Sequence, residues 1–352
     1  MTTGSRTTTR RPSPAKGAPA GGAPVNGTPV NGVYARTFRW HRWQRRWAPY
    51  LFVSPFFILF AVFGLFPTLF SIYLSFQSWN PVQGLGSMKW VGVENYQFLL
   101  TDPWFWKSLR NTIWIALASG IPQHVIAIPL AFVLVSGVRG ALRHPLTAAY
   151  FLPYITSTVA VAIVFNTIFG TQFGLLNWAI DGLASWPVTA WLFSGIKESL
   201  PINWLGRAPY IKPAISILVA WKYFGFNVVL YSAGLATIPR EYHEAAMVDG
   251  ASPLQRFWHI TLPLLRPMMF FAVTLTIIGN LQLFDEPFIL TNRTGGPSES
   301  GLTLAMYLYR TGFEWLDMGT AAAMAWVLFL VIGTATIVHF LLSGRRGLER
   351  RE

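Results

Sequence analysis

The sequence predicts an all-α membrane protein with six transmembrane helices. Of its 352 residues, 53% are hydrophobic and only 12% are charged, whereas a soluble domain is usually about 25% charged. Too few polar side chains remain to cover a surface that faces water on all sides. A helix satisfies its own backbone hydrogen bonds in lipid, so long apolar runs indicate membrane-spanning helices.

The net charge of +13 is concentrated before the first apolar run, which argues against a nucleic-acid partner. Nine basic residues lie between Arg6 and Arg46, and the first acidic residue is Glu94. Residues 1–33 are rich in Thr, Pro, Gly and Ala, a composition that cannot bury enough apolar area to offset its ordering entropy. We therefore expect residues 1–47 to be a disordered basic tail that ends in an interfacial anchor.

Residues 48–342 contain the predicted transmembrane domain. The expected spans are about 48–78, 111–138, 145–169, 213–238, 266–290 and 319–342. Cytoplasmic loops carry an excess of Lys and Arg. Most of the 27 Lys and Arg fall on one side if the tail, the loop at Arg139, the loop 239–265 and the basic end 343–352 are cytoplasmic. Both termini are therefore predicted to be cytoplasmic, with a lipid bilayer around the spans.

The polar stretch Pro239–Pro267 predicts two short helices joined by a glycine corner. A proline followed by carboxylates is typical of a first helical turn. Gly250 can leave that helix in the left-handed conformation, and Ser252 with Pro253 can cap and start the next one. Leu254, Phe257 and Trp258 then form one predicted apolar stripe. A connection whose residues specify this much local structure is expected to have a function of its own.

Ionisable residues inside two of the spans are the candidates for a substrate pathway. Lys222 lies in the fourth span, and Asp285 and Glu286 lie in the fifth, with Tyr223 and Asn227 nearby. Such residues are costly in lipid and indicate function. Two alternatives stay open: Lys222 pairs with Asp285 or Glu286 inside the bundle, or it extends to the outer headgroups while the acids line a water-filled mouth.

The sequence contains no pattern for catalysis, metal binding or nucleotide binding. It has no GxxxxGK[ST] motif, no cysteine, and no pair of histidines at metal-ligand spacing. A membrane enzyme is therefore disfavoured. A secondary transporter that uses Lys222, Asp285 and Glu286 as an ion relay is the alternative function, although such folds tend to contain repeats, and none is evident here.

The stretch after the fourth span resembles the EAA signature of ABC importer permeases. Glu-Ala-Ala is followed after three intervening residues by glycine, and after nine more residues by Ile-x-Leu-Pro. Gly225-Phe226-Asn227 and Thr294-Gly295-Gly296-Pro297 are similar to the sugar-importer branch. Ser54-Pro55 and Phe66-Pro67 make the chain more similar to the MalF-like subunits than to their MalG-like partners.

This resemblance implies a MetI-like ABC importer permease fold in a bacterial plasma membrane. It also implies a di- or oligosaccharide as cargo, a MalG-like second permease subunit, an extracellular sugar-binding protein, and an ABC ATPase dimer that uses the ATP, with no cofactor in this chain. In this family the EAA loop docks on the ATPase. The carried-over coupling residues within 239–263 are Glu244, Ala245, Ala246, Asp249, Gly250, Ile260, Leu262 and Pro263.

Overall fold

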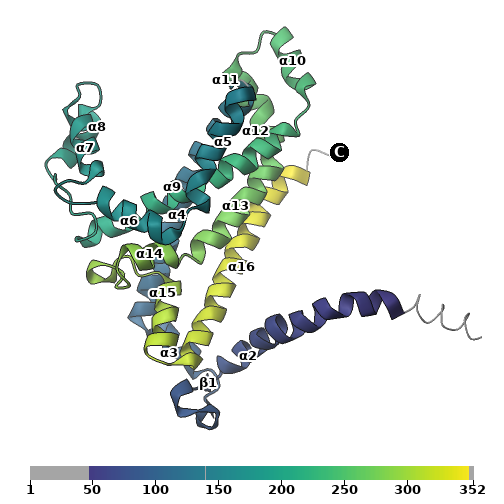
Figure 1. Cartoon of the computed structure of the whole chain (residues 1–352), viewed down its shortest axis with the longest axis vertical. Helices are drawn as coiled ribbons and strands as arrows, with labels where there is room; N and C mark the ends of the chain where they lie inside the picture. The colour runs from purple at the N-terminus through teal and green to yellow at the C-terminus, as the bar shows by residue number, and fades with distance from the viewer. Residues whose placement is uncertain (1–46, 139, 349–352) are drawn as a thin grey trace, which may run out of the picture. The chain divides into compact units, whose positions relative to one another are not determined.

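The computed structural model describes residues 47–138 and 140–348 (Figure 1). The predicted tail therefore lies almost wholly outside the described residues. The chain divides into two compact units, residues 1–67 and 68–352. In the first unit, Trp47 begins a helix that runs to Leu74 and crosses the boundary between the units. This helix contains a π-helical segment, η1 (Ala61–Leu65), followed by α2 (Phe66–Leu74).

Within the described residues, four helices are long and apolar enough to cross a membrane. They are Trp47–Leu74, α4 (Pro103–Ser136), α9 (Ala208–Ala236) and the first part of α16 (Met318–Leu348). Two bent pairs also qualify, α5 (Gly140–Ile155) with α6 (Thr158–Ile168), and Pro253–Leu264 with α13 (Arg266–Leu281). In the part of the chain that the structure describes, the number of candidate spans is therefore four, or up to six if each bent pair is one span.

The third expected span, 145–169, is not one straight helix, because α5 and α6 meet at 94°. Pro153 supplies no backbone N–H, and Ser157 adopts an extended conformation with φ −51° and ψ 130°. A proline in the last turn weakens the helical ladder just before the bend.

The fifth expected span, 266–290, is also interrupted. Helix α13 ends at Leu281, and a separate short helix, α14 (Asp285–Leu290), begins after a break. Pro287 fits α14 because a first turn does not need its missing N–H. At the break, the Thr303 hydroxyl donates a hydrogen bond to the Leu283 carbonyl at 2.9 Å. Tertiary contacts thus satisfy the backbone where the helix is broken.

Short elements fill the connections between the long helices. A two-stranded antiparallel ribbon pairs β1 (Gln77–Ser78) with β2 (Lys89–Trp90). The remaining elements are η2 (Pro81–Gln83), η3 (Leu85–Ser87), α3 (Glu94–Thr101), α7 (Leu175–Ser185), α8 (Ala190–Lys197), α10 (Arg240–Val248), α11 (Pro253–Arg256), η4 (Phe257–Thr261), α12 (Leu262–Leu264), η5 (Pro297–Glu299), α15 (Leu304–Tyr309) and η6 (Arg310–Glu314).

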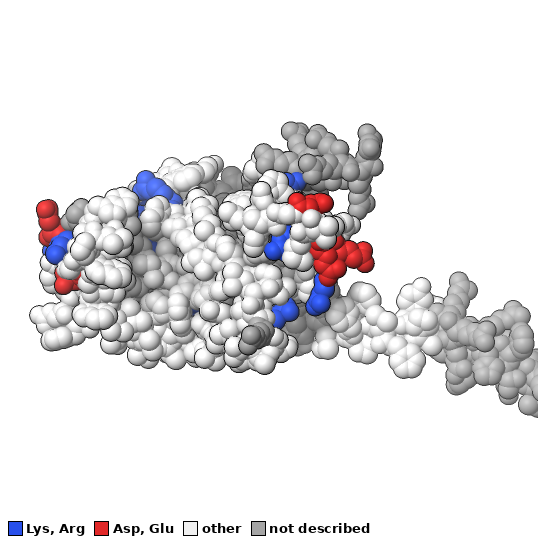
Figure 2. Space-filling view, turned by 90° about the horizontal axis from the view of Figure 1, so that it is seen from above, with Lys and Arg blue, Asp and Glu red and all other residues white. Residues whose placement is uncertain are grey.

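Helices α4 and α9 form the centre of the second unit, and α5 packs across α9. Small residues make this close packing possible, including Ala127 and Ala131 of α4, which are fully buried. A Cβ atom at Gly225 of α9 would overlap the Tyr150 carbonyl oxygen of α5. The glycine in the Gly-Phe-Asn triplet is therefore required for the approach of α5. In the face shown in Figure 2, the described Lys, Arg, Asp and Glu gather in a few clusters, and most of the surface is uncharged.

Candidate functional site: an uncharged cavity and an exposed coupling element

Three neutral amides lie inside the bundle on neighbouring helices. Gln123 of α4, Asn227 of α9 and Asn280 of α13 are all buried. The Asn227 amide nitrogen donates to the Gln123 side-chain oxygen at 3.2 Å. The Asn280 amide donates to the Ser119 hydroxyl at 3.0 Å and to the Ala116 carbonyl at 3.2 Å. These bonds link α9 and α13 to α4.

The amides face a cavity of about 260 Å³ between α4, α5, α9 and α13. The described residues that line it are Gln123, Tyr154, Tyr223, Phe226, Asn227, Leu275, Thr276, Gly279 and Asn280. Within the described part of the chain, the Gln123 amide nitrogen and the Asn227 side-chain oxygen each have an unused bonding position. A buried polar atom without a partner costs roughly 1–3 kcal/mol. Both atoms have almost no accessible surface, so this donor and this acceptor reach a guest molecule when the two amide side chains turn toward the cavity.

Three aromatic rings form one wall of this cavity. Tyr154 of α5 stacks on Phe226 of α9, with ring centroids 4.7 Å apart and planes inclined by 22°. Tyr154 also meets Tyr223 edge to face at 5.9 Å. The approach of α5 to α9 over Gly225 brings these rings together. They give the cavity a rigid apolar face beside its polar amides.

Lys222 and Glu286 form a buried ion pair directly behind this wall. The Lys222 ammonium and a Glu286 carboxylate oxygen are 2.8 Å apart, and their side chains are 5% and 3% exposed. The Tyr223 hydroxyl donates to the same oxygen at 2.7 Å. Lys222 also donates to the hydroxyl of Thr158, the first residue of α6. The network therefore joins α9, α14 and α6.

This geometry decides between the two alternatives for Lys222. The prediction of an ion pair inside the bundle is confirmed, with Glu286 as the partner. The alternative in which Lys222 extends to the headgroups is wrong, because the ammonium is buried and bonded. Asp285 is exposed and forms no ion pair within the described residues. Only two of the five pathway candidates, Tyr223 and Asn227, line the cavity.

Among the cavity residues that sequence reasoning missed are the polar or aromatic residues Gln123, Tyr154 and Asn280. The signal for the two amides was present, since each is an uncharged polar residue within an expected apolar span. Interhelical bonds from such amides are common in membrane bundles. Tyr154 carried no comparable signal, because an aromatic residue is ordinary near a membrane interface.

The stretch after α9 has the predicted local structure. Helix α10 ends before Gly250, which is left-handed with φ +79°. The Ser252 hydroxyl accepts from the Gln255 amide at 3.3 Å, and the Gln255 side chain accepts from the Ser252 amide at 2.7 Å. This reciprocal capping box starts α11. Pro239 is the residue before α10 rather than its first helical residue.

The second predicted helix of this stretch is subdivided. Ile260 lies in the π-helical segment η4, and Leu262 with Pro263 lies in α12. Pro263 supplies no N–H for an α-helical bond, and a π-helical turn accommodates the interruption. The chain then bends by 68° before α13.

The coupling candidates of α10 and its corner are accessible. Glu244, Ala245, Asp249 and Gly250 are exposed, and Ala246 is half-buried. Ile260, Leu262 and Pro263 are also half-buried.

The predicted apolar stripe is divided between the bundle and the surface. Phe257 packs edge to face on Phe132 of α4, with centroids 5.1 Å apart, whereas Leu254 and Trp258 are exposed. Partial burial and the charge of Arg256 lower the pKa of His243. Helix α10 is thus accessible, while η4 is anchored to the bundle.

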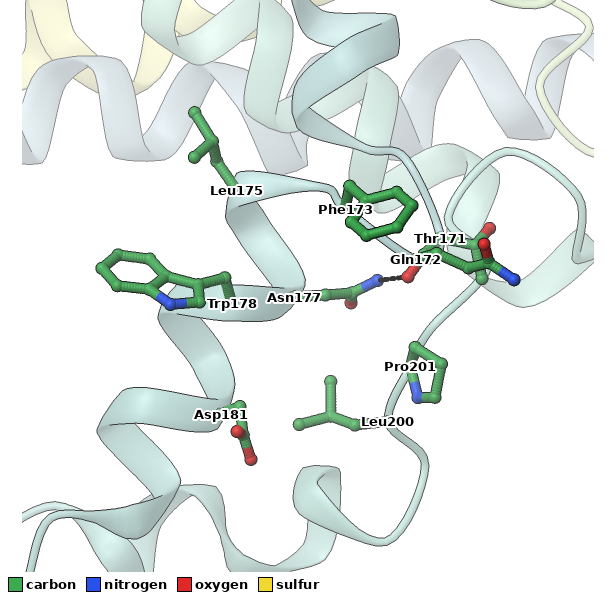
Figure 3. A pocket seen from close by; sticks show the side chains of 9 residues that line it. All are labelled: Thr171, Gln172, Phe173, Leu175, Asn177, Trp178, Asp181, Leu200 and Pro201. Atoms are coloured by element: carbon green, nitrogen blue, oxygen red, sulfur yellow. Dashed lines mark hydrogen bonds between the residues drawn. The ribbon is translucent and has the colours of Figure 1, made fainter.

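A larger hollow of about 670 Å³ lies beside α7 (Figure 3). Asn177 is the buried polar side chain in this hollow, and both its amide nitrogen and its amide oxygen already have hydrogen-bond partners. It donates to the Thr171 carbonyl at 3.0 Å and the Ile202 carbonyl at 2.9 Å, and it accepts from the Trp204 indole at 2.9 Å. Asn177 therefore fastens the surrounding loops, and the smaller cavity is the better candidate site.

Residues 112–351 match the family described as binding-protein-dependent transport system inner membrane component. The chain belongs to this family. It is therefore a multi-pass protein of the bacterial plasma membrane and a permease component of an ABC importer. The matched residues include the cavity, the ion pair and the coupling element. Membership in a binding-protein-dependent family also disfavours the secondary-transporter alternative.

Curated relatives cover nearly the whole chain. The arabinooligosaccharides transport system permease protein AraP of Bacillus subtilis is 33% identical over 86% of this chain and 90% of its own length. The lactose transport system permease protein LacF of Rhizobium radiobacter is 34% identical over 84% of this chain and 94% of its own length.

A solved structure shows the same fold. A chain of a bacterial ABC transporter involved in the import of the acidic polysaccharide alginate matches with a TM-score of 0.70 and 21% identity. The match covers 87% of this chain and 98% of that chain. The all-α MetI-like permease fold is thereby established.

Proposed function

We propose that this chain forms half of the translocation pathway of an ATP-driven importer for a di- or oligosaccharide. The observation that carries this proposal is the cavity, which places neutral amides opposite an aromatic wall inside the bundle. A sugar ring presents hydroxyl groups that both donate and accept, and C–H faces that pack on aromatic rings. The unpartnered donor of Gln123 and the unpartnered acceptor of Asn227 suit these hydroxyl groups once their side chains turn toward the cavity.

The relatives support a carbohydrate as the cargo. Two of them are named for the transport of arabinooligosaccharides and lactose. The substrate pathway of this chain then runs past Tyr223 and Asn227, while Lys222 and Glu286 hold Tyr223 from behind. Asp285 lies outside the cavity wall.

Residues 239–263 couple this pathway to an ATPase dimer. The geometry of this segment supports the coupling role. Helix α10 is exposed, its corner is fixed by a left-handed glycine, and η4 is packed on α4. A rigid element transmits a rigid-body movement, whereas a flexible loop would absorb it. Glu244 is the fifth residue of α10 and lies beyond the first turn, which favours a contact with a partner over stabilisation of the helix N-terminus.

The complete importer contains a MalG-like second permease and an extracellular sugar-binding protein. The family description names binding-protein dependence, and one structural relative was solved with a periplasmic protein bound to an alginate pentasaccharide. The ATPase subunits use the ATP, and this chain carries no cofactor. Both termini and the coupling element face the cytoplasm.

Uptake by the reconstituted transporter tests this function. The permeases, ATPases and binding protein are placed in proteoliposomes, and the entry of labelled arabino-oligosaccharides and lactose is measured with and without ATP. We expect ATP-dependent uptake that is lost when Glu244 and Gly250 are both replaced. Glu241→Ala in the same helix is the matched control. ATP-independent entry, or full uptake by the double variant, would refute the proposal.

A further inference from the structure

We infer that the cavity admits uncharged sugar rings and excludes their uronates, because its described lining carries no cationic group and the ion pair behind it neutralises itself. The inference rests on the proposed function, since it concerns the selectivity of the same pathway. It concerns the cargo of this chain alone, and it predicts a cargo unlike the acidic alginate of its structural relative.

The described lining of the cavity carries no formal charge. It consists of amides, aromatic rings, apolar groups and the hydroxyl groups of Tyr154, Tyr223 and Thr276. The nearest ionic groups lie behind Tyr223, whose ring centroid is 5.3 Å from the Lys222 ammonium. The Tyr223 hydroxyl is bonded to Glu286. The Tyr223 side chain therefore separates a guest molecule in the cavity from the ion pair.

Both charged groups of the pair already have hydrogen-bond partners within the protein. Lys222 donates to Glu286 and to Thr158, and Glu286 accepts from Lys222 and Tyr223. With the two groups 2.8 Å apart, the attraction of the ammonium for an anion in the cavity is nearly cancelled by the repulsion of the carboxylate. No other cationic side chain lies in the described lining of the cavity to compensate an entering carboxylate.

The open polar atoms also distinguish a hydroxyl group from a carboxylate. Once the two amide side chains turn toward the cavity, a hydroxyl can accept from the Gln123 amide nitrogen and donate to the Asn227 oxygen. A carboxylate only accepts, so it would place negative oxygens against the Asn227 oxygen without a bond. An uncompensated anion in a water-poor site is strongly disfavoured. For both reasons, a sugar with a carboxylate in place of its hydroxymethyl group should bind more weakly in the cavity.

The test uses methyl β-glucoside and methyl β-glucuronide, which differ only in that group. Binding is measured by saturation-transfer NMR on the complete permease–ATPase complex in nanodiscs, without binding protein, so that only the transporter contributes. We expect a clear signal from the glucoside and one weaker by about tenfold or more from the glucuronide. Asn227→Leu should remove the glucoside signal, which assigns it to the cavity.

Removal of one charge should reverse the exclusion. Glu286→Gln leaves the Lys222 ammonium unopposed, and the glucuronide signal should rise severalfold. Asp285→Asn removes a negative charge one residue away, on an exposed side chain, and should change neither signal. If Glu286→Gln does not assemble, the uncharged pair Lys222→Met with Glu286→Leu decides, because it should retain the preference for the glucoside.

Three results would overturn the inference: equal signals from both sugars in the wild type, no signal from either, or loss of the preference in the uncharged double variant. Sugar uptake driven by ATP is measured on the same preparation. If uptake is intact while the two sugars bind equally, only the selectivity is wrong. If ATP drives no uptake, the proposed function itself fails.

Discussion

Replacing Glu286 with Gln removes the carboxylate that holds both Lys222 and Tyr223. The ammonium stays buried, with only Thr158 as a bonded partner among the described residues. Breaking a buried ion pair by removing one partner costs about 3–5 kcal/mol, because the remaining charge is uncompensated. We therefore expect Glu286→Gln and Lys222→Met each to lower the free energy of unfolding by about 3–5 kcal/mol.

Removing both charges together should lower the free energy of unfolding far less than the sum of the two single substitutions. Apolar replacements of similar volume are often neutral at buried ion pairs, so Lys222→Met with Glu286→Leu should be close to the wild type. Unfolding is followed by intrinsic tryptophan fluorescence, since the chain has 16 Trp and no Cys. Asp285→Asn is the control, expected within about 0.5 kcal/mol of the wild type. Additive losses in the double variant would show that the two residues are not coupled.

Three further substitutions test the packing and the coupling element. Gly225→Ala should prevent folding of the permease, because a Cβ atom would overlap the Tyr150 carbonyl oxygen. The purified protein should then no longer elute as a monodisperse peak. Gly279→Ala should fold normally, because a Cβ atom there faces open space. Gly250→Ala should strain the corner at φ +79° by about 1 kcal/mol and lower uptake per ATP hydrolysed; an unchanged ratio would contradict the coupling role. His243 has a lowered pKa in the fold, so it opposes folding once protonated. Protection of α10 from hydrogen exchange should fall as the pH drops below 6.5, the ordinary pKa of a histidine, and His243→Gln should abolish that fall.

Local signals in the sequence were sufficient for the short elements. The glycine corner and the capping box depend on residues only a few positions apart, so their geometry does not need a distant partner. The same holds for the apolar runs, whose length alone makes them candidates for membrane helices. The breaks at 156–157 and 282–284 were missed, because hydropathy averaged over a span does not register where a proline and tertiary bonds redirect the backbone.

The sequence by itself determined that this chain is a membrane bundle with a structured polar element after its fourth apolar run. It also placed Lys222 in the fourth expected span and two acids in the fifth. Asp285 and Glu286 are adjacent, so their side chains point about 100° apart around α14, and only the rotation of that helix decided that Glu286 meets Lys222. The cavity was likewise a tertiary result. Its amides and rings come from four helices, and their meeting depends on packing that no local pattern encodes.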